Sequence, residues 1–148
     1  MAGPSLSWPV EPVGGEDEPL RVSVIVVTYN AWQALAACLR SLAEQERQPD
    51  EVIVVDNASR DGTPNLLARY FPWVTRVELG RNVGFAAGNN QGLQAASGDA
   101  IVLLNNDTVA EPAAIARMVA PLEADLTVGA VGATMVFAAA PEIVASAG

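Results

Sequence analysis

The sequence predicts an α/β fold in which a mostly parallel sheet carries helices on both faces. Short apolar, β-branched runs alternate with segments whose apolar residues recur at helical spacing. This alternation indicates βαβ units with right-handed crossovers. Several of the expected strands also run directly into a polar or glycine-rich turn. Because ligands bind beyond the carboxyl ends of the strands in such sheets, these turns together outline one expected site.

The first elements are a strand, a helix and a second strand. Residues 22–27 are almost entirely apolar and β-branched, as in a strand that is covered on both faces. Residues 31–45 place apolar side chains at helical spacing. They include Cys38, which we expect in the core because free cysteine is usually buried. Residues 51–55 form the second buried strand.

A second helix and a third strand follow. Thr63 before Pro64 predicts a helix start with a capping hydroxyl and a proline in the first turn. This helix should end near Tyr70, and residues 74–79 should form the third strand.

The remaining elements repeat the alternation. They are expected as a helix at 87–97 that Gly98 caps, a strand at 100–104, a helix from Pro112 to about Glu123, and a fifth strand at 127–136. We expect residues 1–20 to be a flexible Pro/Gly-rich, acidic leader and residues 21–148 to be the folded domain. Because no closing element follows residue 141, we expect a longer enzyme that continues past Gly148.

Composition excludes several classes of function. The chain has no histidine, which removes histidine-dependent triads, histidine metal sites and a histidine general base. The net charge of −9 argues against a nucleic-acid-binding surface, which needs clustered Lys and Arg. One cysteine fits a reducing compartment, and we see neither a secretory signal nor a transmembrane span. We therefore expect a cytoplasmic protein.

The first βα turn contains Thr28, Tyr29 and Asn30 and no glycine, so the dinucleotide-binding fingerprint is absent there. A P-loop is also absent, since the chain has no lysine. The absence of both motifs disfavours an oxidoreductase that uses a dinucleotide. Binding of NADH without a divalent ion would support that alternative after all. Tyr29 can stack on a base, and Asp56 can bond a ribose or base edge.

The run Asn105-Asn106-Asp107 follows an apolar strand, so its polar side chains should emerge together at the sheet edge. A carboxylate there can hold one position on Mg²⁺ or Mn²⁺, with water and substrate phosphates completing the shell. The alternative is an Asx turn that only joins strand to helix.

The segment 80–92 combines glycines with amide side chains. Glycine lets the backbone approach a ligand, and Arg81 can meet a diphosphate with its fork of donors. The alternative is a flexible connection whose asparagines occupy left-handed turns.

At these turns the chain resembles family 2 glycosyltransferases of the GT-A fold, which has a Rossmann-like sheet. The resemblance covers residues 21–136, and its motifs lie at 22–30, 54–63, 82–90 and 103–107. The last two are similar to the branch that includes rhamnosyltransferases. The resemblance implies a domain without its acceptor half.

The resemblance also implies a role for each matching position. Nucleotide-sugar binding would fall to Thr28, Tyr29, Asn30, Asp56, Asn57, Arg81, Asn82, Gly84, Asn105 and Asn106. Asp107 would coordinate Mg²⁺ or Mn²⁺ in place of the last residue of the family's Asp-x-Asp motif. The first two positions of that motif are amides here.

The implied reaction is transfer of a sugar, with inversion, from a nucleoside diphosphate sugar such as dTDP-rhamnose to a saccharide or lipid-linked acceptor. In the family the base comes from the C-terminal half, and no residue here matches it. The alternative is a fragment that binds a nucleotide sugar without catalysis. Lipid-linked acceptors would place the enzyme at the inner face of a membrane, although no basic amphipathic helix supports this.

Overall fold

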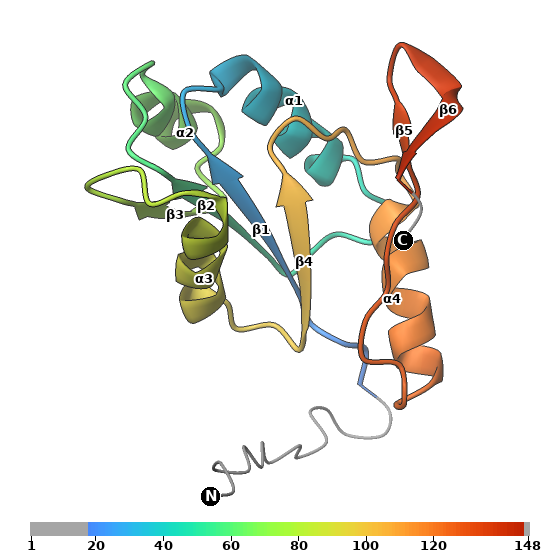
Figure 1. Cartoon of the computed structure of the whole chain (residues 1–148). Helices are drawn as coiled ribbons and strands as arrows, with labels where there is room; N and C mark the ends of the chain where they lie inside the picture. Colours follow the sequence, from blue (N-terminus) through green and yellow to red (C-terminus); the bar gives the residue numbers. More distant parts are fainter. Residues whose placement is uncertain (1–17, 147–148) are drawn as a thin grey trace, which may run out of the picture.

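The computed structural model describes residues 18–146. Its main sheet is parallel and four-stranded, in the order β3-β2-β1-β4 (Figure 1). The strands are β1 (Val22–Thr28), β2 (Glu51–Asp56), β3 (Thr75–Glu78) and β4 (Ala100–Asn105). The helices are α1 (Trp32–Ala43), α2 (Thr63–Tyr70), α3 (Phe85–Ala95) and α4 (Ala114–Ala124). The expected α/β architecture is confirmed.

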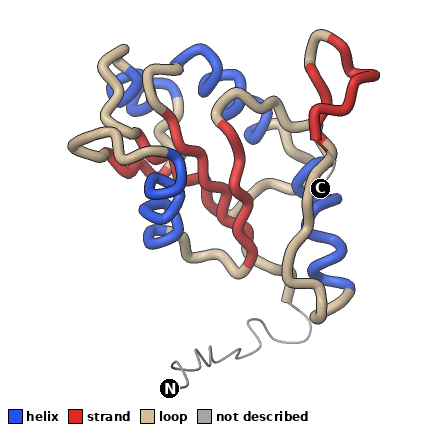
Figure 2. The backbone as a smooth tube through the Cα atoms, viewed as in Figure 1, coloured by secondary structure: helices blue, strands red, loops and turns tan. Residues whose placement is uncertain are grey.

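Alternation along the strands divides the core between the two faces of the sheet. Val24 and Val26 point to one face, where they pack with Leu35 and Leu39 of α1 and Ile115 of α4. A smaller cluster covers the other face and contains Ile25, Val27, Ile53 and Val55. The helix α3 lies over this second face, so helices cover both faces of the sheet (Figures 1 and 2).

The chain after α4 differs from the expected fifth strand at 127–136. Residues 126–134 form no strand, and the next strands are β5 (Met135–Phe137) and β6 (Ala140–Ser146). These two pair antiparallel with each other as a separate hairpin. The expected strand fails because this stretch is largely exposed, and an apolar run becomes a sheet strand only where a partner covers it.

Gly98 does not cap α3, which ends at Ala95 with an extended Ala96 after it. Instead, Gly98 allows its own backbone to approach the backbone of Ser23 closely. A Cβ on Gly98 would lie 2.7 Å from the backbone nitrogen of Ser23, and Gly98 N–H donates to Ser23 Oγ at 2.9 Å. The glycine therefore lets the chain pass tightly beside the start of β1.

Residues 1–17 and 147–148 lie outside the described residues, so the expected leader stays a prediction there. Leu20 is described, and its N–H donates to Glu123 Oε1 at 3.0 Å while Arg47 donates to its carbonyl at 2.8 Å. Arg47 and Glu123 also form an ion pair at 2.9 Å. Within residues 18–146, no helix is long and apolar enough to cross a membrane.

Candidate functional site

The polar turns lie at one edge of the main sheet, as predicted. Because all its strands run parallel, their carboxyl ends meet at the same edge. Register places Thr28 beside Asp56, and Val27 beside Asn105. The turns that follow β1, β2 and β4 therefore emerge side by side, and hydrogen bonds join them.

The turn after β4 is tied to β1. Asn106 Nδ2 donates to Thr28 Oγ1 at 3.1 Å, and Thr28 is almost fully buried. Asn106 thus fixes the junction of the two strands while it also borders the hollow described below. Its amide retains further hydrogen-bonding capacity, since a primary amide carries two N–H groups.

Asp56 holds the turn that follows its own strand. Its buried carboxylate accepts from Ser59 N–H at 3.1 Å. Within this turn Ala58 has a φ of 66°, a left-handed conformation that is uncommon for alanine. Backbone strain of this kind is found preferentially at functional sites.

Asn57 connects the β2 turn to the loop before α3. Its Oδ1 accepts from Val83 N–H at 2.8 Å, and its Nδ2 donates to Gly84 O at 3.2 Å. Asn57 is 3% exposed, and both hydrogen bonds are partly buried. Asn82 Oδ1 adds a local bond by accepting from Gly84 N–H at 2.9 Å. Asn57 therefore fixes the loop that carries Arg81.

The β1 and β2 turns are also joined. Asn30 N–H donates to Ser59 Oγ at 2.9 Å, and Asn30 Oδ1 accepts from Arg60 N–H at 2.7 Å. Asn30 has a φ of 48°, which asparagine tolerates well. Asn30 thus lies at the sheet edge, as expected, and its side chain accepts a hydrogen bond from the backbone of Arg60.

Asp61 serves the starts of two helices. Its Oδ2 accepts from Trp32 N–H at 3.2 Å, and its Oδ1 accepts from the N–H and the hydroxyl of Thr63 at 3.1 and 2.6 Å. Partial burial acts to raise the pKa of Asp61, but these hydrogen bonds outweigh it and lower the pKa. The expected capping hydroxyl of Thr63 is thus a donor to Asp61, and Gly62 occupies the cap position.

Two hollows border the edge. The first has a volume of about 290 Å³ and is lined by Thr28, Tyr29, Asn57, Asn82, Gly84 and Asn106, with Val27 and Phe85. Most of the residues expected to bind a nucleotide sugar thus meet in one place. Sequence reasoning gave no role to Phe85, which is 57% exposed at the start of α3. The signal was its place directly after Gly84 in a recognised motif.

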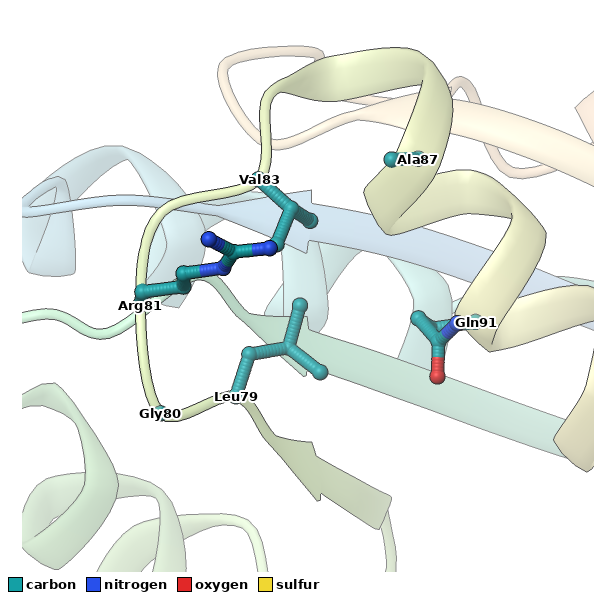
Figure 3. A pocket seen from close by; sticks show the side chains of 6 residues that line it. All are labelled: Leu79, Gly80, Arg81, Val83, Ala87 and Gln91. Atoms are coloured by element: carbon teal, nitrogen blue, oxygen red, sulfur yellow. The ribbon is translucent and has the colours of Figure 1, made fainter.

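The second hollow has a volume of about 500 Å³ and contains Arg81. Figure 3 shows Leu79, Arg81 and Val83 on the loop and Ala87 and Gln91 on α3. Arg81 therefore lines a different hollow from Asn82 and Gly84, which line the first. Asn30, Asp56, Asn105 and Asp107 line neither hollow.

Asp107 is the expected metal ligand. It is exposed in the turn after β4, next to Asn105 and Asn106. Within residues 18–146, no three Cys, Asp or Glu side chains gather in a way that could hold a metal ion. One carboxylate beside amide oxygens suits an ion that keeps its waters and is completed by phosphates, and does not suit an all-protein cage.

Cys38 is fully buried on α1, as predicted. Burial, with a further contribution from the negative charge of Asp107, raises the pKa of the Cys38 thiol from 9.0 to about 12. The thiol therefore stays protonated and unreactive at neutral pH. The rings of Trp32 and Trp73 each pack against Phe71 in a T-shaped arrangement, although Trp73 remains 47% exposed.

Comparison with known proteins assigns the family. The profile of "Glycosyl transferase family 2" matches residues 23–142, which include every polar turn described above. The chain belongs to glycosyl transferase family 2. It is 33% identical over 105 residues to the Bacillus subtilis "Uncharacterized glycosyltransferase YwdF", covering 70% of this chain and 39% of that protein. It is 35% identical over 99 residues to the "Succinoglycan biosynthesis protein ExoO" of Rhizobium meliloti, covering 66% and 28%.

Solved structures agree with the family. A Pyrobaculum calidifontis mannosyltransferase, PcManGT, in complex with GDP-Man and Mn²⁺, is 36% identical with a TM-score of 0.70, over 82% of this chain and 37% of that one. TarS of S. aureus is 28% identical with a TM-score of 0.64, over 70% and 32%. These are GT-A glycosyltransferases, so the expected GT-A fold is confirmed. The chain spans less than two fifths of the length of these relatives.

Proposed function

We propose that this chain is the donor-binding part of a glycosyltransferase that acts on a nucleoside diphosphate sugar. The observation that carries the proposal is the meeting of polar turns from β1, β2 and β4 and the loop before α3 around one hollow, within a family 2 sequence. In this proposal the first hollow takes the nucleoside, with Tyr29 against the base. PcManGT binds GDP-Man, and TarS has been solved with UDP and UDP-GlcNAc, which supports the same class of ligand here.

Arg81 and Asp107 would serve the diphosphate. Arg81 offers a fork of donors from an exposed side chain, while Asp107 would hold Mg²⁺ or Mn²⁺ against the phosphates. A bound ion would supply positive charge to the leaving diphosphate. Asp56, Asn57, Asn82, Gly84, Asn105 and Asn106 would complete the donor site and keep its turns in place.

The finer assignments are also part of the proposal. They are inversion at the transferred carbon, a rhamnosyltransferase-like preference for dTDP-rhamnose, and a saccharide or lipid-linked acceptor. Relatives named for succinoglycan and teichuronic acid biosynthesis support a role in polysaccharide or cell-wall assembly. With a lipid-linked acceptor the protein would work in the cytoplasm at the inner face of the membrane. We assign no catalytic base, and the second candidate is a chain that binds the nucleotide sugar without transferring it.

The test is calorimetric titration of the chain with dTDP, UDP and GDP, with and without Mn²⁺. We expect one nucleotide to bind with an affinity that Mn²⁺ increases. Asp107→Ala should remove the increase, whereas Glu142→Ala, which deletes an equal charge from the exposed hairpin, should keep it. A cooperatively folded chain that binds none of the three nucleotides would refute the donor site.

A further inference from the structure

Two buried polar side chains at the end of α1 face the segment that carries Asp107. Ser41 lies on α1, and Gln45 lies one helical turn further along the chain. They are 6% and 4% exposed. Polar groups buried to this degree require hydrogen-bond partners, and their partners show what they hold.

The partners are backbone groups of the segment between β4 and α4 and of the first turn of α4. Ser41 Oγ accepts from Ala110 N–H at 3.0 Å. Gln45 Nε2 donates to Glu111 O at 2.8 Å, and Gln45 Oε1 accepts from Ile115 N–H at 3.0 Å. Each side chain also bonds α1 itself, because Ser41 donates to Cys38 O and Gln45 donates to Ser41 O. The end of α1 and the segment are thus joined by a chain of buried and partly buried hydrogen bonds.

Two further contacts act on the same segment. Cys38 Sγ lies 3.7 Å from Asn105 O, and Glu46 N–H donates to Pro112 O at 2.8 Å. Backbone is therefore held both before and after Asp107, while Asp107 itself is exposed. The charge of Asp107 contributes to the raised pKa of Cys38, so its carboxylate lies within electrostatic reach of α1.

We propose that Ser41 and Gln45 are positioning residues for Asp107, which they place for a divalent cation by fixing the backbone at Ala110, Glu111 and Ile115. The inference rests on the proposed function of Asp107. It also explains why a hydroxyl and an amide occupy these buried positions: leucine at both would leave the N–H groups of Ala110 and Ile115 without partners, while Glu111 O would keep its bond from Ala114 N–H.

The physical reason is the narrow tolerance of a cation site. A single carboxylate ligand must be held to within about 0.5 Å by groups that are themselves fixed. An unanchored loop samples many positions and binds its ligand less tightly, because binding must then order it. Residues that orient metal ligands without touching the metal typically contribute about 10–100-fold to its affinity.

The experiment compares Gln45→Met and Ser41→Ala with Gln48→Met as the matched control. Gln48 is also an amide, in the loop after α1, and its side chain donates to Ala43 O and Gln45 O and not to the segment that carries Asp107. Each variant of the 148-residue chain is titrated with UDP, dTDP and GDP with and without Mn²⁺, and amide hydrogen exchange is measured over residues 106–113. Thermal melting checks that each variant folds. Ser41→Ala removes only one oxygen atom, so it still tests the proposal in the event that Gln45→Met does not fold.

We expect the Mn²⁺-dependent gain in nucleotide affinity to fall about tenfold in Gln45→Met, with metal-free affinity unchanged. Exchange at residues 108–111 should quicken in Gln45→Met and Ser41→Ala but not in Gln48→Met. A wild-type metal effect that survives in both test variants overturns the positioning role. If the wild type shows no metal effect, the proposed function of Asp107 fails instead, and unchanged exchange in Ser41→Ala then overturns the anchoring as well.

Discussion

Gly92 of α3 lies directly against Ile25 of β1: a Cβ on Gly92 would stand 2.4 Å from Ile25 Cγ2 and 3.2 Å from Val55 Cγ2. Ile25 is fully buried in a central strand, so it has no room to retreat. The backbone of α3 therefore packs directly against the sheet. This contact sets the distance between α3 and the sheet, and with it the position of Gly84 and Phe85 beside the first hollow.

Gly92→Ala is expected to lower the free energy of unfolding by about 1–3 kcal/mol, because overpacking outweighs the gain of about 1 kcal/mol in helix propensity. Urea denaturation measures the change. Gly80→Ala is the control, since a Cβ there meets nothing within 4 Å. Equal stability of Gly92→Ala and wild type would mean that α3 stands further from the sheet.

Asn57→Asp should destabilise the chain by about 1–3 kcal/mol at neutral pH. The substitution keeps the acceptor for Val83 N–H but places a carboxylate oxygen against Gly84 O, where Asn57 now donates at 3.2 Å. Asn82→Asp is the matched control, because Asn82 uses only its oxygen, toward Gly84 N–H, and is exposed. Urea denaturation of both variants measures the two losses of stability. Equal losses would contradict the role of Asn57 in connecting the β2 turn to the loop before α3.

Thr28→Val should cost about 1 kcal/mol of stability, because it removes the acceptor of the Asn106 side chain without changing the shape of β1. Binding of nucleotide should weaken in parallel if Asn106 borders the donor site. Thr75→Val, on the exposed edge strand β3, should change stability by less than about 0.5 kcal/mol. Chemical denaturation and calorimetry of both variants test the difference.

The raised pKa of Cys38 predicts a loss of stability at alkaline pH. The folded thiol titrates near pH 12 and the unfolded thiol near 9.0, so from about pH 9 upward only the unfolded chain releases the proton. The free energy of unfolding should then fall by up to about 1.4 kcal/mol per pH unit between pH 9 and 12. No lysine titrates in this window to obscure the effect.

Cys38→Ala should be less stable than wild type at pH 7 because it leaves a cavity, yet its stability should depend less on pH between 9 and 12. The measurement is urea denaturation at half-unit pH steps. Parallel pH curves for the two proteins would show that the folded thiol ionises near its ordinary pKa.

The sequence was sufficient for the parallel sheet because its two central strands are buried on both faces and so read as unbroken apolar runs, in residues 22–27 and 51–55. The position of the polar turns at one edge of the sheet followed from its parallel topology alone. The 127–136 region could not be predicted in the same way: apolar residues there are exposed, and strand formation depends on partners that local sequence does not specify.

Within the site, residue types predicted location better than they predicted partners. Asn57 and Asn106 were expected to face a ligand, and they border the hollow, but both also bond protein groups across turns. Asp61 and Gln45 act through contacts with residues distant in sequence, 29 residues to Trp32 and 70 residues to Ile115. Such long-range partners leave no local pattern in a single sequence.

The short segment from Leu79 to Gly84 has a consequence for how this domain can change. Asn82 and Gly84 line one hollow, while Leu79, Arg81 and Val83 line the other, so neighbouring residues form a wall that both share. Enlarging one hollow by altering this wall reshapes the other. In the proposed donor site, one substitution in this wall would therefore alter the shape of both hollows at once.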